Sequence, residues 1–179
     1  MAEPLGPTLA LDVAARFLAT RPRSAWEVRR RLERAGADPA TADDVLRRLA
    51  ELGLVDDVAF ARWWRDQRDR HRPRGRRMLE AELRGKGVPR EVIEALRDEA
   101  PERPPEAASA PSTEEERARA ALEAHLRGRP LPTDRRGLER LGMFLVRRGF
   151  DPATARAIIR ERGADESDAG VAEPSGEAE

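Results

Sequence analysis

Apolar residues recur along this chain three or four positions apart, which is the spacing of one helix face. Leu9, Val13 and Phe17 form one such stripe, and Val28 and Leu32 form the next. No segment alternates between apolar and polar residues as a half-buried strand does. The pattern therefore predicts an all-α fold.

A Leu-x-x-x-Gly sequence occurs three times, each time shortly before a proline. Glycine suits the left-handed residue that follows a helix end, and proline suits the first turn of the next helix. The three glycines are Gly36, Gly87 and Gly149, and the prolines that follow them are Pro39, Pro89 and Pro152. This recurrence predicts a tandem array of three three-helix units.

Helix starts are marked by capping sequences. Ser24 and Glu27 have the spacing of a capping box, as do Thr113 and Glu116, and Asp38 directly precedes a proline. These signals set the predicted boundaries, which are a first three-helix repeat at 8–54, a second with a basic connector at 55–100, a proline-rich linker at 101–112, a third repeat at 113–162, and a disordered acidic tail at 163–179.

The amino-acid composition excludes several kinds of core and functional site. Hydrophobic residues make up 39% of the 179 residues and charged residues 38%, which favours several thin helical cores over one large core. Cysteine is absent, which excludes disulfides, thiolate zinc sites and a cysteine nucleophile. The sequence has no apolar run of about 20 residues and no signal-peptide pattern, so we expect a cytoplasmic protein that does not bind membranes.

The net charge of zero conceals a basic cluster. Residues 62–90 contain 11 basic and 4 acidic residues, whereas residues 163–179 contain acids and no base. Such a cluster is either a solvated loop or a surface for acidic protein or nucleic acid. We take as candidate partner-binding residues Trp63, Arg68, Arg70, Arg72, Arg74, Arg76, Arg77 and Lys86.

Two pairs of adjacent residues each allow two interpretations. Asp56 and Asp57 could contact a partner or a metal, but an Asp at a helix start is explained by capping alone. Trp63 either packs between helices or contacts a partner, whereas Trp64 shares the helical stripe of Phe60 and is expected in the core.

No catalytic motif is present. His71 and His125 have no acidic neighbours at metal-ligand spacing, and the sequence carries neither a phosphate-binding loop nor a nucleophile elbow. Gly87 follows a helix end instead of opening a phosphate loop. We therefore expect no enzyme activity, no cofactor and no metal.

Several segments in order resemble the RecX family of bacterial regulatory proteins, which modulate the recombinase RecA. Residues 53–61, Gly-Leu-Val-Asp-Asp-Val-Ala-Phe-Ala, are similar to the family's Gly-x-Leu-Asp-Asp-x-x-Phe. Residues 82–88, Glu-Leu-Arg-Gly-Lys-Gly-Val, are similar to its Glu-Leu-x-x-Lys-Gly-Ile. Leu131-Pro132 and residues 144–150 also fit, so the resemblance extends over about residues 8–162. The structural residues that carry it are Asp56, Asp57, Phe60, Gly36, Gly87 and Gly149.

The resemblance implies an elongated, curved monomer that lies along the groove of a RecA filament. There it would inhibit ATP hydrolysis, filament assembly and DNA strand exchange, and so act in homologous recombination, DNA repair and the SOS response. The connector at residues 68–75 departs from the family, because its usual aromatic residue is missing. Weak, salt-dependent binding of single- or double-stranded DNA would fit the basic cluster.

The alternative is a sequence-specific or nonspecific DNA-binding regulator of the winged-helix kind. The two helices expected at 24–35 and 39–52, followed by Gly-Leu-Val at 53–55, resemble its helical part. A β-hairpin wing would have to follow them. The helical spacing after Asp57 argues against one.

Overall fold

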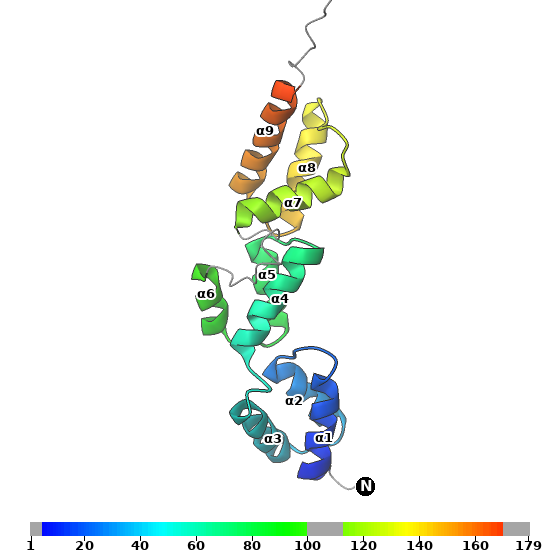
Figure 1. Ribbon diagram of the computed structural model, residues 1–179, viewed down its shortest axis with the longest axis vertical. Helices are drawn as coiled ribbons and strands as arrows, with labels where there is room; N and C mark the ends of the chain where they lie inside the picture. The colour runs from blue at the N-terminus through cyan, green and yellow to red at the C-terminus, as the bar shows by residue number, and fades with distance from the viewer. Residues whose placement is uncertain (1–4, 100–112, 170–179) are drawn as a thin grey trace, which may run out of the picture. The chain divides into compact units, whose positions relative to one another are not determined.

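The computed structural model describes residues 5–99 and 113–169, which form helices and no strand (Figure 1). The all-α prediction is confirmed for these residues. The helices are α1 (Pro7–Leu18), α2 (Ala25–Arg34), α3 (Pro39–Glu51), α4 (Asp57–His71), α5 (Arg76–Gly85), α6 (Arg90–Asp98), α7 (Glu114–Leu126), α8 (Arg135–Arg147) and α9 (Pro152–Ala169).

The chain divides into two compact units. The first comprises residues 1–67 and 80–102, and the second comprises residues 68–79 and 103–179. Helices α4 and α5 therefore contribute residues to both units. The division into three repeats at 8–54, 55–100 and 113–162 stays a prediction.

Each compact unit contains an apolar cluster formed by three helices. Helices α1, α2 and α3 bury Ala14, Leu32 and Leu49 in the first unit. Helices α7, α8 and α9 bury Leu122, Leu145 and Ile158 in the second. Leu32 belongs to a stripe identified in the sequence. The stripe expected in α1 is only partly right, because Leu9 is exposed while Ala10 and Ala14 are fully buried.

The predicted helix starts are confirmed. Ser24 caps α2 and Thr113 caps α7, each in a complete capping box with the Glu three residues later. Asp38 caps α3 by accepting a hydrogen bond from the amide of Thr41. These caps satisfy amide donors that the first helical turn leaves unpaired.

The recurring Leu-x-x-x-Gly sequence forms the same helix end three times. Gly36, Gly87 and Gly149 have φ angles of 93°, 70° and 89°, in the left-handed region. At each site the amide of the residue after the glycine donates to the carbonyl of the leucine, as in a Schellman motif. Leu32, Leu83 and Leu145 are fully buried, so each motif fixes a helix end to a core.

The predicted boundary of the acidic tail is wrong. Residues 163–169 are helical and form the last part of α9, which ends at Ala169. Glu166 accepts hydrogen bonds from the amide of Leu131 at 3.1 Å and pairs with Arg162 at 3.2 Å, which holds this last part of α9. The proline-rich linker at 101–112 and residues 170–179 lie outside the described residues.

Within the part of the chain that the structure describes, no helix has both the length and the apolar character that crossing a membrane requires.

Candidate functional site

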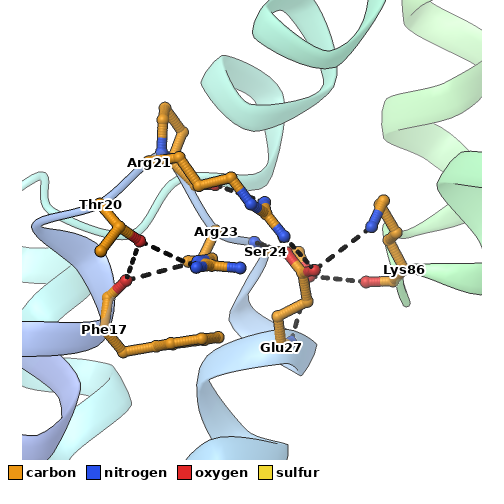
Figure 2. A network of polar contacts seen from close by, with 8 residues as sticks. Phe17, Thr20, Arg21, Arg23, Ser24, Glu27 and Lys86 are labelled. Carbon is orange, nitrogen blue, oxygen red and sulfur yellow. Dashed lines mark hydrogen bonds and ion pairs between the residues drawn. The ribbon is translucent and has the colours of Figure 1, made fainter.

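A polar network joins the start of α2 to the end of α5, and we call this contact the first junction (Figure 2). The hydroxyl of Ser24 donates to the carbonyl oxygen of Lys86 at 2.6 Å, while its oxygen accepts from the amide of Glu27. The ammonium of Lys86 lies 3.3 Å from the carboxylate of Glu27. A single capping residue thus serves both its own helix and a distant one.

Two carboxylates beside the first junction are shifted in opposite directions. Burial raises the pKa of Glu27, but the hydrogen bond from Arg21 and the charge of Lys86 outweigh it, so the pKa lies below its ordinary value. Burial is also the main influence on Asp57, and it raises that pKa despite the hydrogen bond from the amide of Ala25. Glu27 is therefore stabilised as an anion, whereas Asp57 is not.

Lys86, a predicted partner-binding residue, is occupied by internal contacts. Besides its pair with Glu27, its ammonium lies 4.1 Å from the centroid of the Trp64 ring, a cation–π contact. Its side chain is only 21% exposed. These contacts connect α5 to α2 and α4 within the first unit, so Lys86 acts as a structural residue in this fold.

The aromatic residues of α4 pack together. Phe60 is buried in the core, and the Trp63 and Trp64 rings lie 5.9 and 6.0 Å from it. Both tryptophans are half-buried, so the expectation that Trp64 is a core residue is wrong. Its indole N–H donates to Glu82 at 2.9 Å, which keeps that edge of the ring at the surface of the unit.

The two aspartates at the start of α4 have separate structural roles. Asp56 accepts hydrogen bonds from the amides of Val58 and Ala59, which confirms the predicted cap. Asp57 accepts from the amide of Ala25 at 2.9 Å, so it belongs to the first junction. Both carboxylates bind backbone amides, as structural residues do.

The arginine-rich connector between α4 and α5 is only partly a free basic surface. Among the described residues, Arg70 and Arg72 are exposed and pair with no acidic side chain. Arg68 and Arg74 are partly buried. Arg76 and Arg77 each have an acidic side chain 3.9 Å away, on Glu114 and Asp151 respectively.

The predicted candidate residues fall into both compact units. Trp63 and Lys86 belong to the first unit, whereas the arginines from Arg68 to Arg77 belong to the second. The connector arginines therefore lie within one unit, whereas Lys86 and Trp63 lie within the other. Their assignment to partner binding stays a prediction.

The start of α5 meets the end of α8 in the second unit, and we call this contact the second junction. The amide of Gly75 donates to the carbonyl of Arg148 at 3.0 Å, and the amide of Arg77 donates to that of Gly149 at 3.2 Å. A Cβ atom on Gly75 would lie 2.2 Å from backbone atoms of Gly149 and Phe150. Only glycine fits there.

Positive charge gathers beside the second junction. Burial lowers the pKa of Arg148, and the charges of Arg74 and Arg72 lower it further. The guanidinium of Arg148 lies 4.8 Å from the ring centroid of Phe144, and its Nη1 donates to the carbonyl of Pro73 at 3.5 Å. Arginines from two segments of the chain thus lie close enough for their charges to act on Arg148.

A second group of arginines was missed by the sequence reasoning. Residues 127–148 carry seven arginines and two acidic residues, which is a smaller excess than that of residues 62–90. The structure places six of the seven along clefts between α7 and α8, namely Arg127, Arg129, Arg136, Arg140, Arg147 and Arg148. Four-residue spacing along α8 was the signal that could have identified part of this face.

Comparisons with known proteins agree with this architecture. A family model described as RecX, first three-helix domain, matches residues 10–49, and one described as RecX, second three-helix domain, matches residues 56–96. The crystal structure of RecX from Lactobacillus salivarius has the same fold, with a TM-score of 0.70 over 88% of this chain and 97% of that chain at 16% identity. The chain thus belongs to a class of proteins built from three-helix domains.

Sequence relatives extend over most of the chain. The regulatory protein RecX of Prosthecochloris aestuarii is 37% identical over 155 residues, which are 85% of this chain and 92% of that protein. The regulatory protein RecX of Thermobifida fusca is 33% identical over 153 residues, which are 85% of this chain and 77% of that protein. The chain belongs to the RecX family of regulatory proteins.

Proposed function

We propose that this protein binds the RecA filament and restrains its ATP hydrolysis, its assembly and DNA strand exchange. Membership of the RecX family supports a regulatory role, and the modulation of RecA is the activity that the family resemblance implies. We further propose that it acts in the cytoplasm as a monomer and without a cofactor.

The observation that carries this proposal is the recurrence of one helix-end contact. The start of α2 holds the carbonyl before Gly87, and the start of α5 holds the carbonyl before Gly149. A chain that repeats a structural unit can present similar elements to successive subunits of a polymer. Weak contacts then add, because each bound unit raises the effective concentration of the next.

The winged-helix alternative is not favoured. Its wing would require a β-hairpin directly after Gly53, but Val55 is buried and α4 begins at Asp57. Asp56 and Asp57, the pair that could have contacted a partner or a metal, accept backbone hydrogen bonds instead. A binding protein explains these residues without further assumptions.

The test measures ATP hydrolysis by RecA on single-stranded DNA while this protein is added. We expect turnover to fall at amounts of the protein below those of RecA. The variant Arg70→Glu with Arg72→Glu reverses two exposed connector arginines that pair with no acidic side chain among the described residues, and we expect it to weaken inhibition about tenfold, because four units of charge change at the surface.

The control variant is Arg31→Glu with Arg34→Glu, which makes the same charge change on exposed residues of α2. If both variants inhibit like the unchanged protein, the connector is not the contact surface. If the unchanged protein leaves ATP turnover unaffected, the proposed function is wrong.

A further inference from the structure

The cleft between the end of α7 and the face of α8 has the composition of an anion site. It has a volume of about 320 Å³ and is lined by Arg127, Arg129, Arg148, His125 and Phe144, together with two alanines. None of the lining residues is acidic. A volume near 300 Å³ is at the lower end of the usual range for small-ligand sites, about 300–1,000 Å³.

The positive charge of this cleft is not neutralised within the described residues. Arg127, Arg129 and Arg148 form no ion pair there, although ion pairs are frequent elsewhere in the chain. Arg129 donates through Nε to the carbonyl of Leu126 at 3.0 Å, which holds the base of its side chain. No acidic side chain among the described residues pairs with the remaining guanidinium N–H groups of these three arginines.

The backbone at the edge of the cleft has an uncommon conformation. Arg127 ends α7 with a φ of 53°, and among the described residues it is the only one other than glycine with a positive φ. Such a conformation costs about 1 kcal/mol in a residue with a side chain. An arginine held in this way suggests a functional reason for its position.

Three planar groups stack along one wall of the cleft. The His125 and Phe144 rings are 4.0 Å apart at an interplanar angle of 27°, and the guanidinium of Arg148 lies 4.8 Å from the Phe144 centroid. His125 is exposed at the outer end of the stack. A nucleobase can continue such a stack, whereas a carboxylate has no planar ring to place there.

The basic face continues along α8 beyond this cleft. A neighbouring cleft of about 780 Å³ shares His125, Arg129 and Phe144 and adds Arg136, Arg140 and Arg147. Arg136, Arg140, Phe144 and Arg148 are four residues apart, so they follow one face of α8 for about 18 Å. The acid on this face, Glu139, pairs with Arg135 at 2.8 Å.

We propose that the α7–α8 face of the second unit is a binding site for single-stranded nucleic acid, with the arginines on consecutive phosphates and a base on His125. Arginine forks match phosphate oxygens, and aromatic groups stack on bases that pairing does not hide. An acidic protein segment would satisfy the arginines but would leave the His125–Phe144 stack without a role. The proposal is independent of RecA binding.

The experiment measures fluorescence anisotropy of a labelled oligodeoxythymidylate with the full chain, without RecA, between about 50 and 200 mM salt. We expect Arg127→Gln with Arg129→Gln to weaken binding about tenfold at low salt. The slope of log K against log salt should become shallower by about 1.4, because each lost phosphate contact on a single strand contributes about 0.7.

The control is Arg156→Gln with Arg160→Gln, which removes from α9 of the same unit two exposed arginines that form no ion pair with the described residues. We expect it to bind within twofold of the unchanged protein. A second test pair, Arg136→Gln with Arg140→Gln, should weaken binding about fivefold, so the proposal does not depend on how well one variant folds.

The variant His125→Ala distinguishes contacts to bases from contacts to phosphates. It should weaken binding of the single strand about fivefold and leave binding of a duplex of the same length unchanged. Three results would overturn the proposal: no binding by the unchanged protein at low salt, equal losses in the test and control pairs, or test pairs that lose RecA inhibition while binding the oligonucleotide normally. The last result would assign the face to a protein partner.

Discussion

The first and second junctions join equivalent helix ends by different chemistry. In the first, the hydroxyl of Ser24 holds the carbonyl of Lys86, and ionised groups surround the bond. In the second, the amide of Gly75 holds the carbonyl of Arg148, and two backbones touch. The first junction should therefore respond to pH, whereas the second should respond to any added side-chain atom.

The largest effect is expected where the backbones touch. In Gly75→Ala the new methyl group would lie 2.2 Å from backbone atoms, which cannot give way as the end of a side chain can. We expect the free energy of unfolding to fall by about 3 kcal/mol. Hydrogen exchange at the amide of Arg77, which donates across the junction, should accelerate with it.

The matched control for this substitution lies in the same helix. A Cβ atom on Gly85 meets nothing within 4 Å, and its backbone is helical. Gly85→Ala should be neutral or stabilising by up to about 1 kcal/mol, because alanine favours helix. Equal losses for Gly75→Ala and Gly85→Ala would show that contact between backbones is not the cause.

The second prediction compares two glycines with the same helix-end conformation. Gly87→Ala adds a methyl group 2.3 Å from Cβ of Trp26, whereas Gly36→Ala meets nothing within 4 Å. Both must adopt a left-handed backbone, at a cost of about 1 kcal/mol. Urea unfolding should give losses of about 2 kcal/mol for Gly87→Ala and about 1 kcal/mol for Gly36→Ala. A larger loss at Gly36 would contradict the role assigned to the junction.

The third prediction isolates the hydroxyl of the first junction. Ser24→Ala loses a cap and leaves the carbonyl of Lys86 without its donor, so we expect a loss of about 1.5 kcal/mol. Thr113→Ala loses a similar capping box at an exposed site, so about 0.7 kcal/mol is expected. Thermal unfolding followed by circular dichroism gives both values. Identical values would mean that the bond to Lys86 adds nothing.

The smallest effects are expected in the pH dependence of stability, which should differ between variants of Glu27 and of Asp57. The pKa of Glu27 is lowered by folding, so its contribution is present above the unfolded value of about 4.3 and is lost as the pH falls through the folded pKa. Glu27→Gln should therefore be less stable than the unchanged protein at pH 7, and the difference should shrink in acid.

Asp57 should give the opposite dependence. Folding raises its pKa, so the unchanged protein loses stability as the pH rises above about 3.9 and the half-buried carboxyl ionises. Asp57→Asn keeps an acceptor for the amide of Ala25 and should gain stability relative to the unchanged protein as the pH rises to 7. Urea unfolding at pH 7 and in acid measures both. Parallel pH profiles for the two variants would contradict the assigned shifts.

Local features of the fold were predictable because their causes are local. The helix ends at Gly36, Gly87 and Gly149 follow from a leucine, a glycine and the backbone between them. The caps at Ser24 and Thr113 need only residues three positions apart. The end of α9 was misplaced because Glu166 is held by Leu131, a partner that is distant in the sequence.

The candidate site was less predictable because it depends on pairing. The sequence shows where arginines are dense, but not that Arg77 lies near Asp151 or that Lys86 lies against Glu27. It also cannot show that Arg127, Arg129 and Arg148 form no ion pair among the described residues. Charge density in the sequence and available charge in the structure are different quantities.

Gly36, the first of the three helix-end glycines, has a carbonyl that bears on self-association. In the second junction the carbonyl of Gly149 accepts the amide of Arg77, but the carbonyl of Gly36 accepts the amide of Leu5 at 3.0 Å, from the chain's own leading segment. The bond from Leu5 thus satisfies this acceptor within the molecule, so Gly36 does not present an unpaired carbonyl to another copy.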